Sequence, residues 1–221
     1  MKVAAFVPIK LNNERAPGKN TKRFDDGTPL ITHFLKTLAM VPEIDELYVF
    51  CSKEEICDYL VPGVHYLKRP ECLDTKEATP QDIISTFMSM VDADVYMVCH
   101  CTSPFVKAAR FSECVQKVCS EEYDSAFTGE KLQRLMWHNG EPLNFDAANV
   151  PRTQDLPVYY NEVSAAYVFH RNTFETLRRR IGVKPYICEV SGVECIDIDY
   201  PEDFQIANAI YMNILKKENQ L

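Results

Sequence analysis

A basic loop follows the first apolar segment of the chain and carries the residues best suited to bind phosphate. Residues 3–9 are apolar and predict a strand, and Lys10 and Lys19 follow with eight residues between them. Ligands of open α/β sheets bind beyond the carboxyl ends of strands, where loop amides and cations hold phosphate. Two ammonium groups at this separation can approach a triphosphate from two sides. The pattern predicts a polyphosphate site.

Two other interpretations of the loop are simpler. Residues 18–20 resemble the end of a Walker A loop, but Asn13 stands where that motif needs its first glycine, and no Ser or Thr follows Lys19. We therefore do not expect an ATPase P-loop. The remaining alternative is a solvated basic turn whose cations pair with Asp25 and Asp26.

Asp197 and Asp199 form a second candidate site. Residues 195–199 predict a strand, in which side chains two apart share a face, so the two carboxylates converge. Mg²⁺ bound by one or two carboxylates together with substrate phosphates would relieve their repulsion. The alternative is that Asp199 caps the last helix, with Glu202 completing a capping box, although capping does not explain Asp197.

Two polar turns are weaker candidates. His100 and Ser103 follow a predicted strand, where the turn could equally cap the next helix. Arg152 lies in a loop bounded by prolines, where it could clamp an anion or only pair with Asp146 or Asp155. Neither turn predicts a function by itself.

The spacing of apolar residues predicts the elements that position these side chains. Short runs rich in Val, Tyr and Phe alternate with segments of helical periodicity, which is typical of βαβ units in a parallel, Rossmann-like sheet with helices on both faces. We expect a three-layer α/β/α fold. The predicted strands are 3–9, 47–51, 64–67, 95–99, 165–170, 186–190 and 195–199, and the predicted helices are 29–40, 81–91, 107–119, 173–180 and 201 to about 217.

Residues 130–160 interrupt the alternation. His138-Asn139-Gly140-Glu141 predicts a tight hairpin turn, and three prolines break regular structure around it. The segment is expected to leave the sheet, as either an active-site flap or an oligomerisation arm.

Composition narrows the class of protein. The 221 residues suffice for one domain, and a net charge of −8 argues against general binding to nucleic acids or anionic membranes. The chain opens on a predicted strand with no signal-peptide pattern, and no apolar run is long enough to span a bilayer, so we expect a cytoplasmic protein. The nine cysteines show no paired metal-binding motif and are expected to be mostly buried thiols.

Taken in order, these motifs resemble the acylneuraminate cytidylyltransferase family, which makes CMP-sialic acids and related CMP-sugars. The resemblance extends over nearly the whole chain. The matching segments are Lys10 with Lys19-Asn20, Arg69-Pro70, Thr79-Pro80 with Asp82, His100 to Pro104, Arg152 to Pro157, and Asp197 to Asp203.

The resemblance implies the nucleotide-diphospho-sugar transferase fold, a homodimer, and transfer of CMP from CTP to an acidic acceptor with release of pyrophosphate. By this resemblance, Lys10, Lys19 and Asp197 would be catalytic, and Asp197 and Asp199 would hold Mg²⁺. CTP would contact Ile9, Lys10, Asn13, Lys19, Asn20, Arg69 and Thr79, and the acceptor would contact His100, Ser103, Arg152 and Gln154.

The departures from the family pattern lie mostly on the acceptor side. Lys10 replaces an arginine and His100 replaces a glutamine, while Asn161 or Glu162 stands near the position of an arginine for the sugar carboxylate. We therefore expect a Mg²⁺- and CTP-dependent cytidylyltransferase that acts on an acidic acceptor, such as a nonulosonic or octulosonic sugar acid. The alternatives are a non-sugar anion such as a phosphonate, or a nucleotide-binding regulatory protein that has lost transfer activity.

Overall fold

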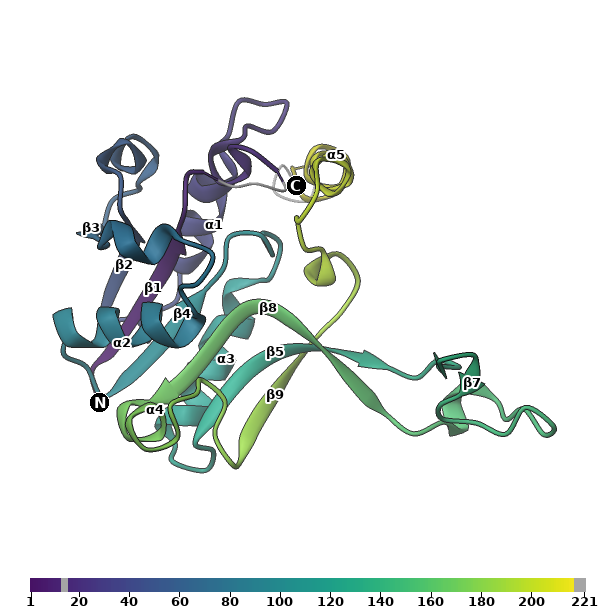
Figure 1. The fold of residues 1–221 in the computed structure, drawn as a ribbon. Helices are drawn as coiled ribbons and strands as arrows, with labels where there is room; N and C mark the ends of the chain where they lie inside the picture. Colours follow the sequence, from purple (N-terminus) through teal and green to yellow (C-terminus); the bar gives the residue numbers. More distant parts are fainter. Residues whose placement is uncertain (13–15, 217–221) are drawn as a thin grey trace.

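A seven-stranded mixed sheet forms the centre of the protein (Figure 1). The computed structural model describes residues 1–12 and 16–216. Neighbouring strands follow the order β3-β2-β1-β4-β8-β5-β9. The strands are β1 (Val3–Ile9), β2 (Glu46–Cys51), β3 (Val64–Lys68), β4 (Val95–Cys99), β5 (Ser125–Leu132), β8 (Tyr159–His170) and β9 (Pro185–Val190).

Helices cover both faces of this sheet and confirm the three-layer fold. α1 and α3 pack their apolar side chains on one face, and α2 and α4 pack on the other. α5 lies beyond the carboxyl ends of the parallel strands and packs on the loops there. The helices are α1 (Leu30–Leu38), α2 (Pro80–Met90), α3 (Ala108–Cys119), α4 (Arg171–Leu177) and α5 (Pro201–Ile210), the last continued by a π-helical turn (Tyr211–Leu215).

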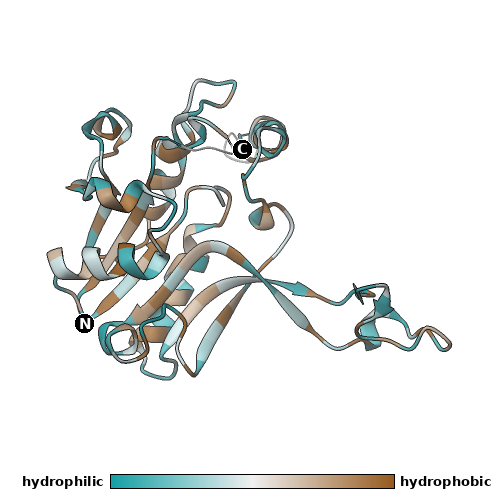
Figure 2. Cartoon of the chain, viewed as in Figure 1, coloured by the Kyte–Doolittle hydropathy of each residue, from teal (hydrophilic) through white to brown (hydrophobic). Residues whose placement is uncertain are grey.

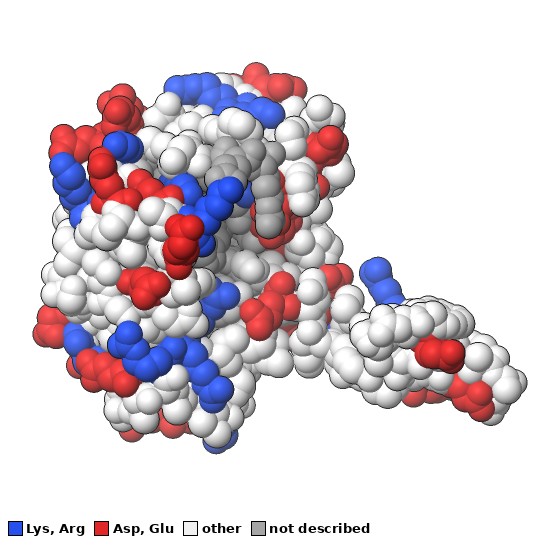
Figure 3. Space-filling view, in the orientation of Figure 1, with Lys and Arg blue, Asp and Glu red and all other residues white. Residues whose placement is uncertain are grey.

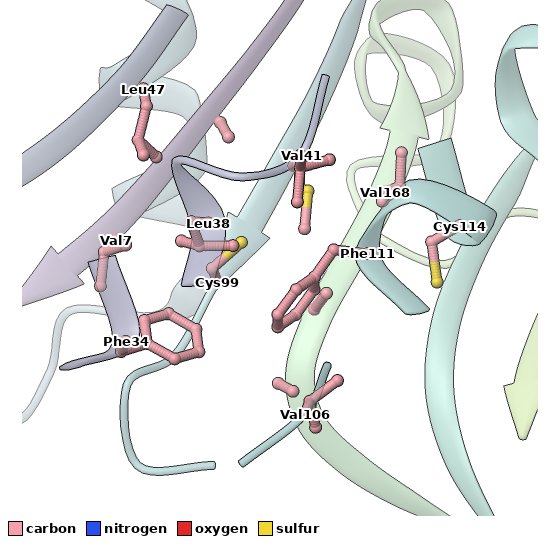
Figure 4. Close-up of a cluster of buried hydrophobic side chains, with 14 of the residues drawn as sticks. Val7, Phe34, Leu38, Val41, Leu47, Cys99, Val106, Phe111, Cys114 and Val168 are labelled. Carbon is pink, nitrogen blue, oxygen red and sulfur yellow. The ribbon is translucent and has the colours of Figure 1, made fainter. Parts of the chain in front are cut away.

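Apolar side chains of the strands fill the two interfaces between sheet and helices (Figure 2). On the α1/α3 face, the Phe34 and Phe111 rings meet edge to face with centroids 5.8 Å apart (Figure 4). On the opposite face, Phe87 of α2 stacks on Phe6 of β1 at 3.9 Å. This burial explains the continuous apolar runs of β1 and β4, since both of their faces are covered.

The expectation of a parallel sheet is confirmed for β1 to β4 and wrong for β8, which is antiparallel to both of its neighbours. β8 returns directly from the segment that follows β5, and a chain that turns back without a crossover pairs antiparallel. β5 itself was not predicted. Its sequence, Ser-Ala-Phe-Thr-Gly, has few large apolar residues, although five consecutive positions are buried.

The strand predicted at 195–199 is also wrong. A short 3-10 turn (Gly192–Cys195) is followed by an extended segment outside the sheet. The backbone N–H of Ile198 donates to the carbonyl of Thr102, which lies in a turn and not in a strand. The segment still alternates between exposed and buried side chains, because Ile198 is buried whereas Asp197 is exposed.

Residues 130–160 form an arm that extends from the sheet (Figure 1). The arm begins as a continuation of β5 and β8, whose pairing runs outward to Leu132 opposite Tyr159. The expected hairpin lies within it, with β6 (Trp137–His138) paired to β7 (Glu141–Pro142). Asn139 and Gly140 both have positive φ, 51° and 85°, as a two-residue hairpin turn requires.

Within the described ranges, no helix has the length and apolar character needed to cross a bilayer.

Candidate active site

The basic loop and the acids near the C-terminus meet beyond the carboxyl end of β1. The Lys19 ammonium donates to the carbonyl of Ile198 at 2.7 Å and to a carboxylate oxygen of Asp199 at 3.1 Å. Gly18 makes the turn that presents Lys19, with a φ of 69° that favours glycine. Two motifs 180 residues apart in sequence therefore belong to one site, as the resemblance implied.

Asn20 connects this loop to the residues that follow β1 and β4. Its side-chain amide, in a residue only 6% exposed, donates to the carbonyl of Lys10 at 3.0 Å. Its amide oxygen lies 3.4 Å from the Cys101 thiol, in the turn that follows β4. Asn20 thus fixes the shape of the phosphate loop from within. Sequence reasoning did not foresee the part played by Cys101, because its C-x-C motif indicated only a buried thiol.

In the alternative interpretation Asp199 caps the last helix, but the N-cap residue of α5 lies one position later. Tyr200 is the N-cap residue, and the Asp203 carboxylate accepts from the backbone N–H groups of Asp199 (3.0 Å) and Tyr200 (2.7 Å). The Asp199 carboxylate contacts Lys19 instead. The alternative of a solvated turn paired Asp26 with the basic loop, but among the described residues the donors from outside its own turn are Tyr211 and Lys216.

Asp197 and Asp199 are the acids available to a metal here. The part of the chain that the structure describes contains no group of three or more His, Cys, Asp or Glu side chains arranged to hold a metal. Asp197 is exposed, and the Asp199 side chain is 45% exposed. Two accessible carboxylates fit Mg²⁺, which takes its remaining ligands from water and substrate phosphates, and do not fit a metal held by protein ligands alone.

His100 lies beside the phosphate loop at the end of β4. Its backbone N–H donates to the carbonyl of Ala165 at 3.1 Å, and its ring faces that of Tyr167 with centroids 6.3 Å apart. Burial, and to a smaller extent the charges of Arg180 and Lys19, lower the pKa of His100 to about 4. The imidazole is therefore neutral at neutral pH, so one ring nitrogen can accept a hydrogen bond.

Several residues that were predicted to contact the nucleotide have a partner within the protein. Arg69 is 2% exposed and forms an ion pair with Asp74. The Thr79 hydroxyl belongs to a capping box with Asp82 at the start of α2. Ile9 is buried at the end of β1, so only its backbone can reach a ligand. Asn13 lies outside the described residues.

The predicted acceptor contacts are not brought together within one chain. Ser103 is fully buried, so a bound acceptor cannot reach its hydroxyl in this conformation. Arg152 and Gln154 lie in the arm, and Arg152 is 73% exposed and pairs with Asp155 at 2.9 Å. Of this set, His100 alone lies beside Lys19. The charge of Arg180 also lowers the pKa of His100. The sequence analysis did not single out Arg180, although the run Arg178-Arg179-Arg180 after a predicted helix could have drawn attention to it.

Comparisons with known proteins find relatives over nearly the whole chain. The family model described as Cytidylyltransferase matches residues 4–221. N-acylneuraminate cytidylyltransferase of Oncorhynchus mykiss is 24% identical over 93% of this chain and 49% of its own length. CMP-N,N'-diacetyllegionaminic acid synthase of Legionella pneumophila is 25% identical over 95% of this chain and 96% of its own length. The chain thus spans about half of the fish relative and nearly all of the bacterial one.

Solved structures resemble this one in fold. CMP:2-keto-3-deoxy-manno-octonic acid synthetase in complex with CTP has a TM-score of 0.71 at 15% identity, over 96% of this chain and 99% of that chain. The 4-diphosphocytidyl-2C-methyl-D-erythritol synthase of Anaerococcus prevotii has a TM-score of 0.65 at 14% identity, over 96% of each chain. Both support the nucleotide-diphospho-sugar transferase fold. Because the family model spans nearly the whole sequence, the chain belongs to the cytidylyltransferase family, and the resemblance to acylneuraminate cytidylyltransferases is confirmed.

Proposed function

We propose that this protein is a Mg²⁺-dependent cytidylyltransferase that transfers CMP from CTP to an acidic acceptor and releases pyrophosphate. The observation that carries the proposal is the contact of Lys19 with Asp199, which joins a phosphate-binding cation to a pair of metal-binding acids. Family membership supports CTP as the donor. The names of the relatives support a sugar acid as the acceptor.

The reaction is an in-line substitution at phosphorus. A hydroxyl oxygen of the acceptor attacks the α-phosphorus of CTP, the bond to the β-phosphate oxygen breaks, and pyrophosphate leaves with the electron pair. Such a transfer depends mainly on positioning and on neutralising charge. Lys10 would neutralise the α-phosphate and the leaving group, and Lys19 would hold the β- and γ-phosphates.

Asp197 and Asp199 would hold Mg²⁺, which, when bound, supplies positive charge to the phosphate oxygens and orients the acceptor. The Lys19 ammonium, 3.1 Å from a carboxylate oxygen of Asp199, would hold that side chain in place before CTP binds. Neutral His100 can accept a hydrogen bond from an acceptor hydroxyl, a contact that its protonated form could not make.

We also propose that two copies of the chain pair through the arm. Apart from a few charges, the visible face of the arm is white in Figure 3, so it carries mostly uncharged residues. Trp137 is 60% exposed and Leu143 is 49% exposed. Exposed apolar residues gathered on one extension mark a protein interaction surface. In a dimer, Arg152 of the arm could then approach a site that it does not reach within its own chain.

Pyrophosphate release from CTP tests the proposed activity. The acceptors to try are 2-keto-3-deoxy-manno-octonate, N-acetylneuraminate, N,N'-diacetyllegionaminate and 2-hydroxyethylphosphonate, each with and without Mg²⁺. We expect release with at least one acid and only with the metal. Tight CTP binding without release from any acceptor would instead favour a nucleotide-binding regulatory protein.

The variant Asp197→Asn tests the metal assignment. It removes one charged ligand while leaving the Lys19–Asp199 contact intact, so we expect turnover to fall at least about 100-fold. Excess Mg²⁺ should restore part of the loss. Asp58→Asn, which removes an exposed acid in the turn before β3, is the matched control. Near-normal turnover of Asp197→Asn would refute the assignment.

A further inference from the structure

Arg180 lies in the short connection between α4 and β9, outside every motif that matched the family. Its guanidinium carbon is 3.5 Å from the ring centroid of Tyr167, so the cation stacks on the face of the ring. Tyr167 is fully buried in the middle of β8, and its hydroxyl donates to Glu162 at 2.8 Å. Stacking on a fixed aromatic ring holds the plane of the guanidinium in place.

The in-plane donors of Arg180 have no partner in the part of the chain that the structure describes. Among the described residues, its guanidinium makes no hydrogen bond or ion pair. Its two neighbours in the arginine run differ in this respect, because Arg178 donates to the Ser85 hydroxyl at 3.0 Å and Arg179 donates to the carbonyl of Gly182 at 3.2 Å. A half-buried arginine with a fixed plane and unused N–H groups is prepared to bind a planar or tetrahedral oxyanion in bidentate fashion.

The position of Arg180 connects it to the candidate active site. The Tyr167 ring on which it stacks faces the His100 ring, and His100 follows β4 in the turn that leads to Cys101 and the phosphate loop. Arg180 and Lys19 both act electrostatically on His100. His100 is therefore near two cations, Lys19 of the phosphate loop and Arg180, which stacks on Tyr167 of β8.

We propose that Arg180 binds the acid group of the acceptor and so selects an anionic acceptor for cytidylyl transfer. The inference rests on the proposed function and extends it, because it assigns the acceptor subsite to a residue that the family pattern does not supply. The anion would lie in the plane of the Arg180 guanidinium, and the acceptor hydroxyl would point past His100 toward the α-phosphate. The shared chemistry is a small oxyanion, either a carboxylate or a phosphonate.

The test compares Arg180→Gln and Arg180→Lys with the wild type and with Arg179→Gln, which removes a charge one residue away. CTP affinity and acceptor affinity are measured separately by calorimetry, the latter on the protein loaded with a non-hydrolysable CTP analogue. The acids are 2-keto-3-deoxy-manno-octonate and N-acetylneuraminate as carboxylates, and 2-hydroxyethylphosphonate as a phosphonate. Pyrophosphate release gives kcat and KM for each acid that is turned over.

For Arg180→Gln we expect CTP affinity within about twofold of the wild type and an acceptor Kd or KM raised at least about tenfold, since a charged hydrogen-bonding partner is lost. Arg180→Lys should lose less, because it keeps the charge without the planar fork. Arg179→Gln should match the wild type. The acid that shows the larger effect identifies carboxylate or phosphonate as the group recognised.

Three outcomes would overturn the proposal. In the first, acceptor affinity is unchanged in Arg180→Gln while the wild type turns the acceptor over, which leaves the proposed activity intact. In the second, CTP affinity falls as much as acceptor affinity, which would place Arg180 at the nucleotide. In the third, the wild type loaded with the analogue binds none of the acids. Loss of CTP binding and turnover in the wild type itself would instead refute the proposed function.

Discussion

Lys19 is held in place by two contacts at the candidate site. Its ammonium has three donors, and two of them are directed at the Ile198 carbonyl and the Asp199 carboxylate. The side chain is 12% exposed, which makes this ion pair less screened than one at the surface. A triphosphate bound at the loop would meet a cation that is already held in place, so little ordering is needed when CTP binds.

Replacing Lys19 with Gln should reduce kcat/KM for CTP at least about 100-fold, because a positioned charge on the phosphates is lost. The measurement is pyrophosphate release under saturating acceptor. Lys22→Gln is the matched control, since Lys22 is an exposed cation of the same loop that lies over the Phe204 ring at 4.3 Å. Equal losses in the two variants would show that general basic charge, and not the position of Lys19, matters.

At the scale of elements, the acids of the site lie in the segment just before α5, so α5 must be held against the first loop. Phe24 of that loop stacks on Phe204 of α5 at 5.5 Å and on Tyr211 at 4.2 Å. Asp26 adds a polar contact, since its carboxylate accepts from the Tyr211 hydroxyl and from the Lys216 ammonium, each at 3.1 Å. The position of Asp199 therefore depends on packing between the two ends of the chain.

The Asp26 contacts predict a pH dependence. Burial alone would raise the pKa of Asp26, but hydrogen bonds from Thr28, Lys216 and Tyr211 lower it to about 2, below the ordinary value of 3.8. A carboxyl whose pKa is lower in the folded protein stabilises it above pH 3.8 and loses that effect as the pH falls toward 2. We expect Asp26→Asn to cost about 1 kcal/mol at neutral pH after solvent screening.

Chemical denaturation of wild type and Asp26→Asn at a series of pH values would measure this effect. The difference in the free energy of unfolding should be constant above pH 5, shrink below pH 4 and vanish near pH 2. A difference that stayed the same down to pH 2 would mean that the carboxylate contributes through shape alone.

At the scale of the whole molecule, the arm separates the predicted acceptor residues from the rest of the site. Arg152 and Gln154 lie on an extension that leaves the sheet, while Lys19, Asp199 and His100 remain at its carboxyl edge (Figure 1). A second chain that pairs through the arm is the arrangement that could reunite them. The proposed dimer thus bears on activity as well as on stability.

Trp137→Ser combined with Leu143→Ser should shift the protein from dimer to monomer in sedimentation experiments, because it removes apolar area from the arm surface. Val183→Ser is the control, since Val183 is 76% exposed but lies outside the arm. If the arm variant stays dimeric, the interface lies elsewhere. If the wild type is monomeric, the proposed pairing is wrong.

Much of the fold could be predicted from the sequence, and so could the two segments that meet at the candidate site. The apolar runs of β1 and β4 gave correct strands, because strands buried on both faces must be apolar throughout. The Asn139-Gly140 pair gave a correct hairpin, because few other residues adopt two successive positive φ angles. Lys19 and Asp199 were named as phosphate and metal ligands before their contact was known.

The tertiary structure decided what no local pattern encodes. The antiparallel course of β8 depends on the chain returning through the arm, and the contact between Lys19 and Asp199 depends on α5 packing over the first loop. Arg180 stacks on Tyr167, a contact between two elements that no spacing in the sequence reveals, and its proposed role in acceptor binding rests on that contact. Local residue preferences act over a few positions, whereas these contacts are fixed by long-range burial, which acts on the folded chain as a whole.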